Sequence, residues 1–153
     1  MATTISRERP DSADARMLID ELEAVLSPLY AAENRHGYSV QKLIQQNVAF
    51  FVLRHDNEPA GCGGIQFFGD EYGELKRMYV RPKFRGKGFA KLMVQHLENF
   101  ARENNVMLLR LETGIHQYEA IALYEKCGFV PIPPFGDYVK SAATSLCYEK
   151  QIK

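Results

Sequence analysis

The sequence has no excess of charge of either sign, because 19 lysine and arginine residues balance 19 aspartate and glutamate residues. Proteins that bind nucleic acids or membrane surfaces by general electrostatics carry a basic excess, so the balance argues against both partners. No apolar run approaches the roughly 20 residues of a membrane span, and residues 1–16 lack an apolar core of signal-peptide length. We therefore expect a cytoplasmic protein with no nucleic-acid or membrane partner.

The sequence is also poor in cysteine. Cys62, Cys127 and Cys147 are odd in number and form no Cys-x-x-Cys pair, and the four histidines show no zinc-ligand spacing. Reduced, buried thiols in a cytoplasmic protein are the simplest interpretation of this usage. We therefore expect no metal ion.

The remaining pattern predicts a single domain over residues 1–153, with residues 1–10 either flexible or holding a short first strand. Helical spacing of apolar residues appears in 11–29, 40–46, 88–103 and 118–128. Strands are predicted at 3–9, in a hairpin over 48–68, and at 72–80, 106–113, 128–134 and 144–150. The order β-α-α-β-β-β-α-β-α-β-β predicts an α/β fold with a mixed, mostly antiparallel central sheet flanked by helices.

Periodicity also predicts which side chains share a face. Strict alternation in 72–80 places Glu74 and Lys76 on the same side as Met78 and Val80. The inner stripe of the first helix is expected to include Val25 and Leu29. The inner stripe of the helix at 88–103 is expected to contain Leu92, Met93, His96, Leu97 and Phe100.

The densest chemical signal is the segment YVRPKFRGKGFAKLM, residues 79–93, where a strand ends and a helix begins. Backbone amides at a helix start lack intrahelical partners and face the positive end of the helix dipole. Gly86 and Gly88 remove side chains that would keep an anion from these amides, so the segment favours a phosphate. Gly88 stands where a P-loop needs serine or threonine, and Lys91 stands where a dinucleotide fingerprint needs its third glycine.

The same segment resembles the acetyl-CoA-binding motif of the GNAT superfamily of N-acetyltransferases. Arg85, Gly88 and Ala90 match the pattern Q/R-x-x-G-x-G/A, and residues 80–82 match its common lead-in, Val-Arg-Pro. Downstream, residues 120–129 (AIALYEKCGF) resemble the family's later motif A-x-x-L-Y-x-x-x-G-F. The two motifs stand in the family's order, and the predicted element order is also the family's.

The resemblance implies an enzyme, an N-acetyltransferase that uses acetyl-CoA and releases CoA. The loop amides would hold the pyrophosphate, and the end of the strand at 72–80 would pair with the pantetheine arm. Many relatives have asparagine where this chain has Gln117, and the glutamine is expected to make similar hydrogen bonds. The implied cofactor-binding residues are Met78, Tyr79, Val80, Arg85, Gly86, Lys87, Gly88, Phe89, Ala90, Gln117 and Tyr124.

Acetyl transfer to an amine requires a base, stabilisation of the oxyanion and an acid for the leaving thiolate. Tyr124 aligns with the family's leaving-group tyrosine, and a phenol near pKa 10 can share a proton with an alkyl thiol at little cost. Glu74 is the proposed base by the resemblance, and Glu112 is the other candidate. The alternatives are that Tyr124 only packs against the sheet and that Glu74 only pairs with a lysine.

The resemblance implies direct transfer, through a ternary complex, to a primary amine of a small molecule or an amino-acid-like acceptor. Substrate contacts are expected from Tyr30, Arg35, Tyr38, Glu112, Phe135 and Tyr138, although these residues could equally cover the ends of the sheet. Two other functions stay open: a catalytically silent acyl-CoA sensor, and an acetyltransferase acting on a protein amine. Open strand edges favour a homodimer.

Overall fold

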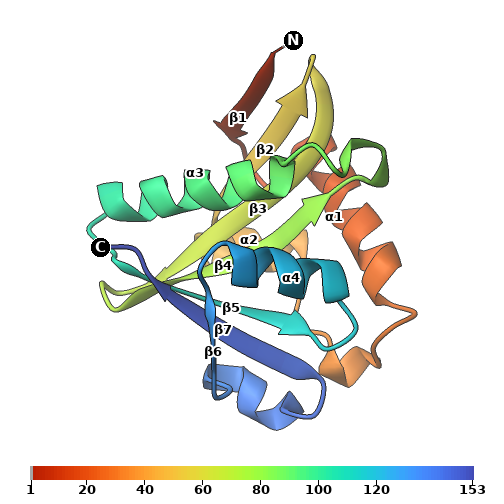
Figure 1. Cartoon of the computed structure of the whole chain (residues 1–153). Coiled ribbons are helices and arrows are strands. Elements are labelled where there is room, and N and C mark those ends of the chain that lie inside the picture. Colours follow the sequence, from red (N-terminus) through yellow and green to blue (C-terminus); the bar gives the residue numbers. More distant parts are fainter. Residues whose placement is uncertain (1) are drawn as a thin grey trace.

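The structure, a computed structural model, describes residues 2–153 and places seven strands of this range in one sheet (Figure 1). The strands are β1 (Thr3–Arg7), β2 (Ala49–His55), β3 (Glu58–Phe68), β4 (Tyr72–Val80), β5 (Leu108–Gly114), β6 (Val130–Ile132) and β7 (Ser145–Gln151). The helices are α1 (Ala13–Leu26), α2 (Val40–Gln45), α3 (Phe89–Glu103) and α4 (Tyr118–Lys126), with 3-10 turns η1 (Ala32–Asn34), η2 (Pro82–Phe84) and η3 (Gly136–Ser141). The predicted α/β fold and element order are confirmed.

Helices cover both faces of the sheet (Figure 1). One buried cluster contains Met93 of α3 and Tyr124 of α4, and the other contains Leu18 of α1 and Leu43 of α2. Burial on both faces explains why the inner strand β2 is mostly apolar, whereas the edge strand β1 is mostly polar and exposed.

Local sequence signals account for the boundaries of these elements. The Ser12 hydroxyl accepts a hydrogen bond from the amide of Ala15 at 3.1 Å, which caps α1. Asp56 and Asn57 both have left-handed φ values, 51° and 69°, and make the tight turn between β2 and β3. The predicted hairpin and its turn are therefore confirmed.

The sheet opens between β4 and β5, its one parallel pair among residues 2–153. Only two residue pairs join these strands, Gly73 with Leu109 and Glu74 with Arg110. Beyond them β4 remains paired with β3, while β5 remains paired with β7. The carboxyl ends of β4 and β5 consequently diverge. Within the described range 2–153, the edge of β4 that faces β5 has no strand partner from residue 75 onward.

A β-bulge in β4 overturns the predicted alternation. The register of β3 with β4 shifts between Cys62 and Gly64, so that Arg77 and Met78 together face one residue, Gly63. Arg77 takes a left-handed φ of 55°, which reverses the alternation after it. The predicted shared face of Glu74, Lys76, Met78 and Val80 is wrong: Leu75, Met78 and Val80 pack in the α3–α4 cluster, whereas Tyr79 packs with α1.

Two predicted apolar stripes also need correction. Val25 and Leu29 near the end of α1 are exposed, because they border the groove described below rather than the sheet. Leu92 of α3 is exposed too, and Val94 is buried instead. The helix therefore meets the sheet on a face rotated from the one that the spacing predicts.

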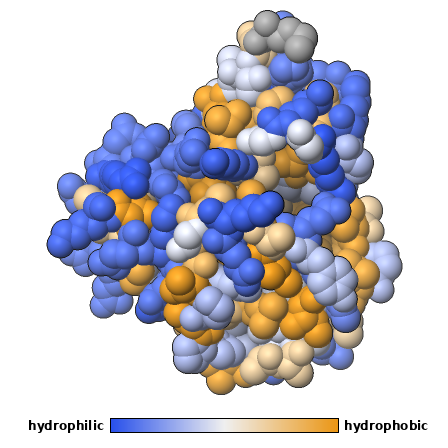
Figure 2. Space-filling view, viewed as in Figure 1, coloured by the Kyte–Doolittle hydropathy of each residue, from blue (hydrophilic) through white to orange (hydrophobic). Residues whose placement is uncertain are grey.

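The surface and the sheet edges bear on assembly and on membranes. The outer side of α3 is mainly hydrophilic, and hydrophobic residues gather over and below α4 (Figure 2). The edge strands are β1 and β6, and Val130 of β6 is exposed. The homodimer stays a prediction. Within residues 2–153, none of the helices has both the length and the apolar character needed to span a membrane.

Candidate active site

Two cavities meet where β4 and β5 diverge. The larger, which we call the groove, has a volume of about 520 Å³, and the smaller, the inner cavity, about 110 Å³. Five residues line both of them: Leu22, Met78, Gln117, Ala120 and Tyr124. The cavities are therefore adjacent, and the junction between them contains two residues from the predicted motifs, Met78 and Tyr124.

One end of the groove is the start of α3. Gly88 is the N-cap residue, so no side chain caps this helix, unlike α1 with Ser12. Gly86 and Gly88 both have φ of 80°, and a Cβ atom at either would meet no atom within 4 Å. The amides of the first turn thus face open space at the positive end of the helix dipole, which fits a phosphate group.

The groove brings together nearly all of the predicted cofactor-binding residues. Lys87 is the one predicted cofactor-binding residue that does not line the groove. The residues that line it are Met78, Tyr79, Val80, Arg85, Gly86, Gly88, Phe89, Ala90, Gln117 and Tyr124. The Gln117 side-chain carbonyl accepts a hydrogen bond from the Gly114 amide at 2.9 Å. The side-chain NH₂ group of Gln117 is therefore the part of this residue that can donate a hydrogen bond to a ligand. Together with the free edge of β4, these features fit the predicted acetyl-CoA.

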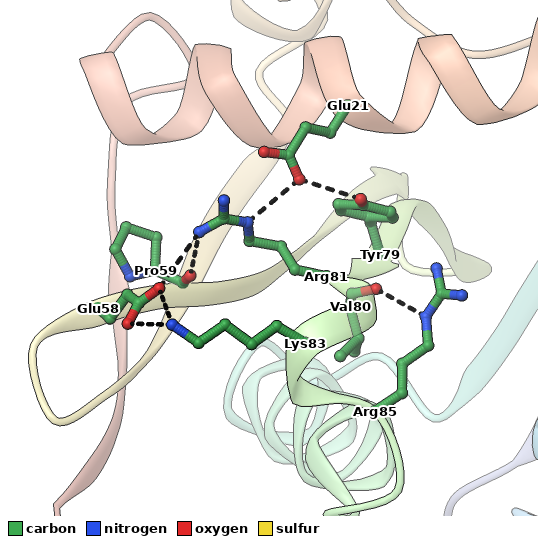
Figure 3. A network of polar contacts seen from close by, with 8 residues as sticks. All are labelled: Glu21, Glu58, Pro59, Tyr79, Val80, Arg81, Lys83 and Arg85. Atoms are coloured by element: carbon green, nitrogen blue, oxygen red, sulfur yellow. Dashed lines mark hydrogen bonds and ion pairs between the residues drawn. The ribbon is translucent and has the colours of Figure 1, made fainter.

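Most cations of the glycine loop are held by protein partners (Figure 3). The Arg81 Nε donates to Glu21 at 3.1 Å, and the Lys83 Nζ lies 3.0 Å from both carboxylate oxygens of Glu58. The Arg85 Nε donates to the Val80 carbonyl at 3.1 Å. These contacts tie the loop to α1 and to the turn between β2 and β3, so Arg81 and Lys83 brace the loop and its backbone amides face the groove.

Tyr124 presents a protonated phenol at the junction. Its ring is buried and packs edge-on against Phe129 with centroids 5.8 Å apart. Burial is the main cause that raises the pKa of Tyr124 above its ordinary value, with smaller contributions from Cys127 and Glu112. Within residues 2–153, no protein group hydrogen-bonds to its hydroxyl. The hydroxyl is therefore available to donate a proton to a ligand.

The two candidate bases differ in access. Glu112 lines the inner cavity, and burial raises its pKa to about 6 while the nearby Ser145 hydroxyl opposes the rise. Glu74 is 3% exposed and lines neither cavity. Its carboxylate accepts hydrogen bonds from Lys76 at 2.7 Å and from the Tyr138 hydroxyl. Glu112 is thus the carboxylate that a ligand can reach.

The predicted substrate residues mostly converge on the inner cavity. Its lining includes Tyr30, Arg35, Tyr38, Glu112 and Tyr138. Phe135 does not line it, because its ring packs against Tyr138 and Tyr72 at centroid distances of 5.2 Å and 5.8 Å. The Tyr30 hydroxyl accepts a hydrogen bond from the His116 amide at 2.9 Å, and this contact fixes the loop before α4.

Sequence reasoning missed several residues of the inner cavity, chiefly His36, Lys76 and Arg77. His36 begins a polar chain, since its Nε2 lies 2.6 Å from the Ser141 hydroxyl, which lies 2.9 Å from the Ser145 hydroxyl. Arg77 depends on the β-bulge, which strict alternation cannot reveal. A usable signal was the glycine-rich run AGCGG in β3, because glycine within a strand marks bulges and close backbone approach.

Comparisons with known proteins agree with this geometry. Residues 16–129 match the model of the acetyltransferase (GNAT) family. The chain is 40% identical over 136 residues to an IAA acetyltransferase of Azospirillum brasilense, which covers 88% of this chain and 89% of that protein. It is 34% identical over 113 residues to the uncharacterised N-acetyltransferase YedL of Escherichia coli, which covers 69% of this chain and 68% of that protein.

Solved structures share the fold over almost the whole chain. A Klebsiella pneumoniae protein named as an acyl-CoA N-acyltransferase superposes with a TM-score of 0.85 and 33% identity, and the match covers 99% of this chain and 98% of that one. The PaiA N-acetyltransferase of Thermoplasma acidophilum, solved in complex with coenzyme A, gives a TM-score of 0.75 at 18% identity, with 99% of each chain covered. On the family match, the relatives and the shared fold, the chain belongs to the GNAT superfamily of N-acetyltransferases.

Proposed function

We propose that this enzyme transfers an acetyl group directly from acetyl-CoA to a primary amine of a small molecule, within a ternary complex. The observation that carries the proposal is the meeting of a large groove and a small cavity at Tyr124 and Met78. Acetyl-CoA supplies the acetyl group as a thioester. A site with one cavity for each substrate needs no acetylated enzyme residue between two half-reactions.

The groove holds the donor by its backbone. The amides of residues 86–90 bind the pyrophosphate at the start of α3, where Gly86 and Gly88 leave open space. The unpaired edge of β4 binds the pantetheine arm as an added strand would. The backbone amide of Met78, which lines both cavities, is the proposed donor to the thioester oxygen.

Glu112 and Tyr124 carry the proton transfers. Glu112 accepts a proton from the acceptor's ammonium group, and the free amine then forms the new N–C bond at the acetyl carbon. As the C–S bond breaks, Tyr124 donates its phenolic proton to the leaving sulfur. The nitrogen passes its second proton to the resulting phenolate, so the products are an N-acetyl amine and CoA, and Glu112 then releases its proton to solvent. Glu74, the base that the resemblance implies, is the alternative.

The size of the inner cavity favours a small acceptor. Its volume of about 110 Å³ is well below the roughly 300 Å³ at which pockets for drug-sized ligands begin. The relative named IAA acetyltransferase also supports a small-molecule acceptor over a protein amine. A silent acyl-CoA sensor is the competing function, although it needs neither a protonated phenol at the junction nor a carboxylate in the inner cavity.

An activity screen with two matched variants tests this proposal. Wild-type protein is incubated with acetyl-CoA and a panel of primary amines while free thiol is followed. We expect turnover on at least one amine, and activity that rises through pH 6 as Glu112 ionises. Glu112→Gln should remove most of this activity, whereas Glu74→Gln should keep the same pH profile. Tight acetyl-CoA binding without turnover on any amine would support the sensor instead.

A further inference from the structure

We propose that the inner cavity contains a carboxylate-binding subsite made by Arg35 and Arg77, and that the acceptor is a small amine that also carries a carboxylate. This inference rests on the proposed function and specifies its substrate class.

The β-bulge places Arg77 in the cavity. Because Arg77 takes a left-handed φ, Lys76 and Arg77 line the inner cavity together although they are consecutive in the strand. The Arg77 side chain is 3% exposed, which is rare for arginine and demands charge partners. A bulge beside an active site commonly redirects one side chain, and here it brings a guanidinium group to the cavity wall.

The negative charge on neighbouring side chains does not balance the positive charge of Arg35 and Arg77. Arg77 donates to Glu23 through Nη2, and the Arg35 Nη1 lies 3.8 Å from the other oxygen of the same carboxylate. Glu23 is thus one negative charge shared by two positive charges. Lys76 is already paired with Glu74 at 2.7 Å, so the surplus positive charge belongs to the arginine pair.

Hydrogen bonding is incomplete at the same place. The Nε atoms of both Arg35 and Arg77 are buried and have no hydrogen-bond partner among residues 2–153. A buried donor of a charged group that lacks a partner is costly, and native proteins rarely leave one unsatisfied without a functional reason. Two guanidinium groups that share one carboxylate present planar forks of N–H donors, which match the two oxygens of a ligand carboxylate.

The polarity of the cavity fixes the acceptor's orientation. Glu112 and Tyr124 reach the cavity from β5 and α4, whereas Arg35 and Arg77 reach it from the segment that follows η1 and from β4. An acceptor whose amine approaches Glu112 would place its carboxylate at the arginines. With a volume of about 110 Å³, the cavity suits a small amino-acid-like molecule.

The test compares each acceptor acid with its own carboxamide, which differs only in the charge of the recognised group. The screen uses free amino acids of increasing chain length and the matching carboxamides, and it reports the ratio of kcat/KM for acid over carboxamide. We expect this ratio to be about 10 to 100 for the preferred acid, because the contact with the carboxylate is charge-assisted. A ratio at or below one for every pair would overturn the subsite.

Two variants and one control assign the effect to the arginines. Arg35→Gln, at a partly exposed position, and Arg77→Lys should each lower the acid-to-carboxamide ratio at least about tenfold. Lys42→Gln removes a nearby cation that lies 4.5 Å from the Tyr38 ring but does not line the cavity, and it should keep the ratio. An unchanged ratio in Arg35→Gln would overturn the assignment even if Arg77→Lys fails to fold.

Failure of this inference is distinct from failure of the proposed function. Turnover of carboxamides in preference to acids would contradict the carboxylate subsite but would still support acetyltransferase activity. Absence of thiol release with every acid and every carboxamide would contradict the proposed function itself.

Discussion

Removal of one oxygen atom from Tyr124 tests its role as the acid. The variant Tyr124→Phe keeps the ring, and therefore the edge-on contact with Phe129 at 5.8 Å. The lost hydroxyl has no hydrogen-bond partner in the protein among residues 2–153, so its removal leaves no buried group unsatisfied. We expect the free energy of unfolding to change by less than about 1 kcal/mol, which for a chain of this length is a melting shift of at most about 4 °C.

The expected effect on catalysis is much larger. General acid catalysis contributes about 10²-fold to 10⁴-fold, so kcat should fall by that factor, equivalent to roughly 3 to 5 kcal/mol of barrier. Because burial raises the pKa of Tyr124, the wild-type phenol stays protonated at neutral pH. The difference in kcat between wild type and Tyr124→Phe therefore measures the loss of a proton donor. The groove amides that bind the donor are unchanged, so the Kd for acetyl-CoA should remain within about twofold.

The assay measures free thiol under saturating acetyl-CoA and acceptor, with calorimetric binding of acetyl-CoA and thermal unfolding on the same preparations. Full activity in Tyr124→Phe would refute the acid role. A fall in kcat accompanied by a comparable loss of stability or of acetyl-CoA binding would show that Tyr124 acts by packing.

Two further predictions concern the groove and the base. Gly88→Val places a side chain in the groove at a left-handed φ, and we expect it to weaken acetyl-CoA binding at least about tenfold. Gly69→Val is the matched control, since its φ of 60° and open surroundings impose similar strain far from the groove; equal loss of binding in both would contradict a pyrophosphate site at α3. Ser145→Ala removes a nearby hydroxyl that lowers the pKa of Glu112, so the acidic limb of the pH profile of kcat/KM should move to higher pH. A limb that stays in place would argue that Glu112 is not the base.

The features that the sequence predicts well are those set by local backbone chemistry. The turn at Asp56 and Asn57 and the glycines at the start of α3 require particular φ values, which restrict the residue types that can stand there. Nearly all of the predicted donor-binding residues line the groove, because the motif is contiguous and its geometry follows from a strand end and a helix start.

The features that the sequence does not predict depend on tertiary contacts. The bulge at Arg77 reverses the faces of β4, and no periodic pattern reveals it. The resemblance favours Glu74 as the base and leaves Glu112 as the other candidate, yet Lys76 and the Tyr138 hydroxyl bind Glu74, whereas Glu112 lines the inner cavity. Tyr138 comes from a segment 64 residues away in the chain from Glu74, and only the packing of such segments distinguishes the two carboxylates.

The most direct test of direct transfer between the two adjacent cavities is an initial-rate matrix in which acetyl-CoA and the preferred amine are varied together. The account predicts intersecting lines in double-reciprocal plots, and intact mass measurements that show no acetylated protein when the amine is omitted. Parallel lines together with a stably acetylated residue would contradict it, and so would thiol release that never exceeds the protein-free blank at any pair of concentrations.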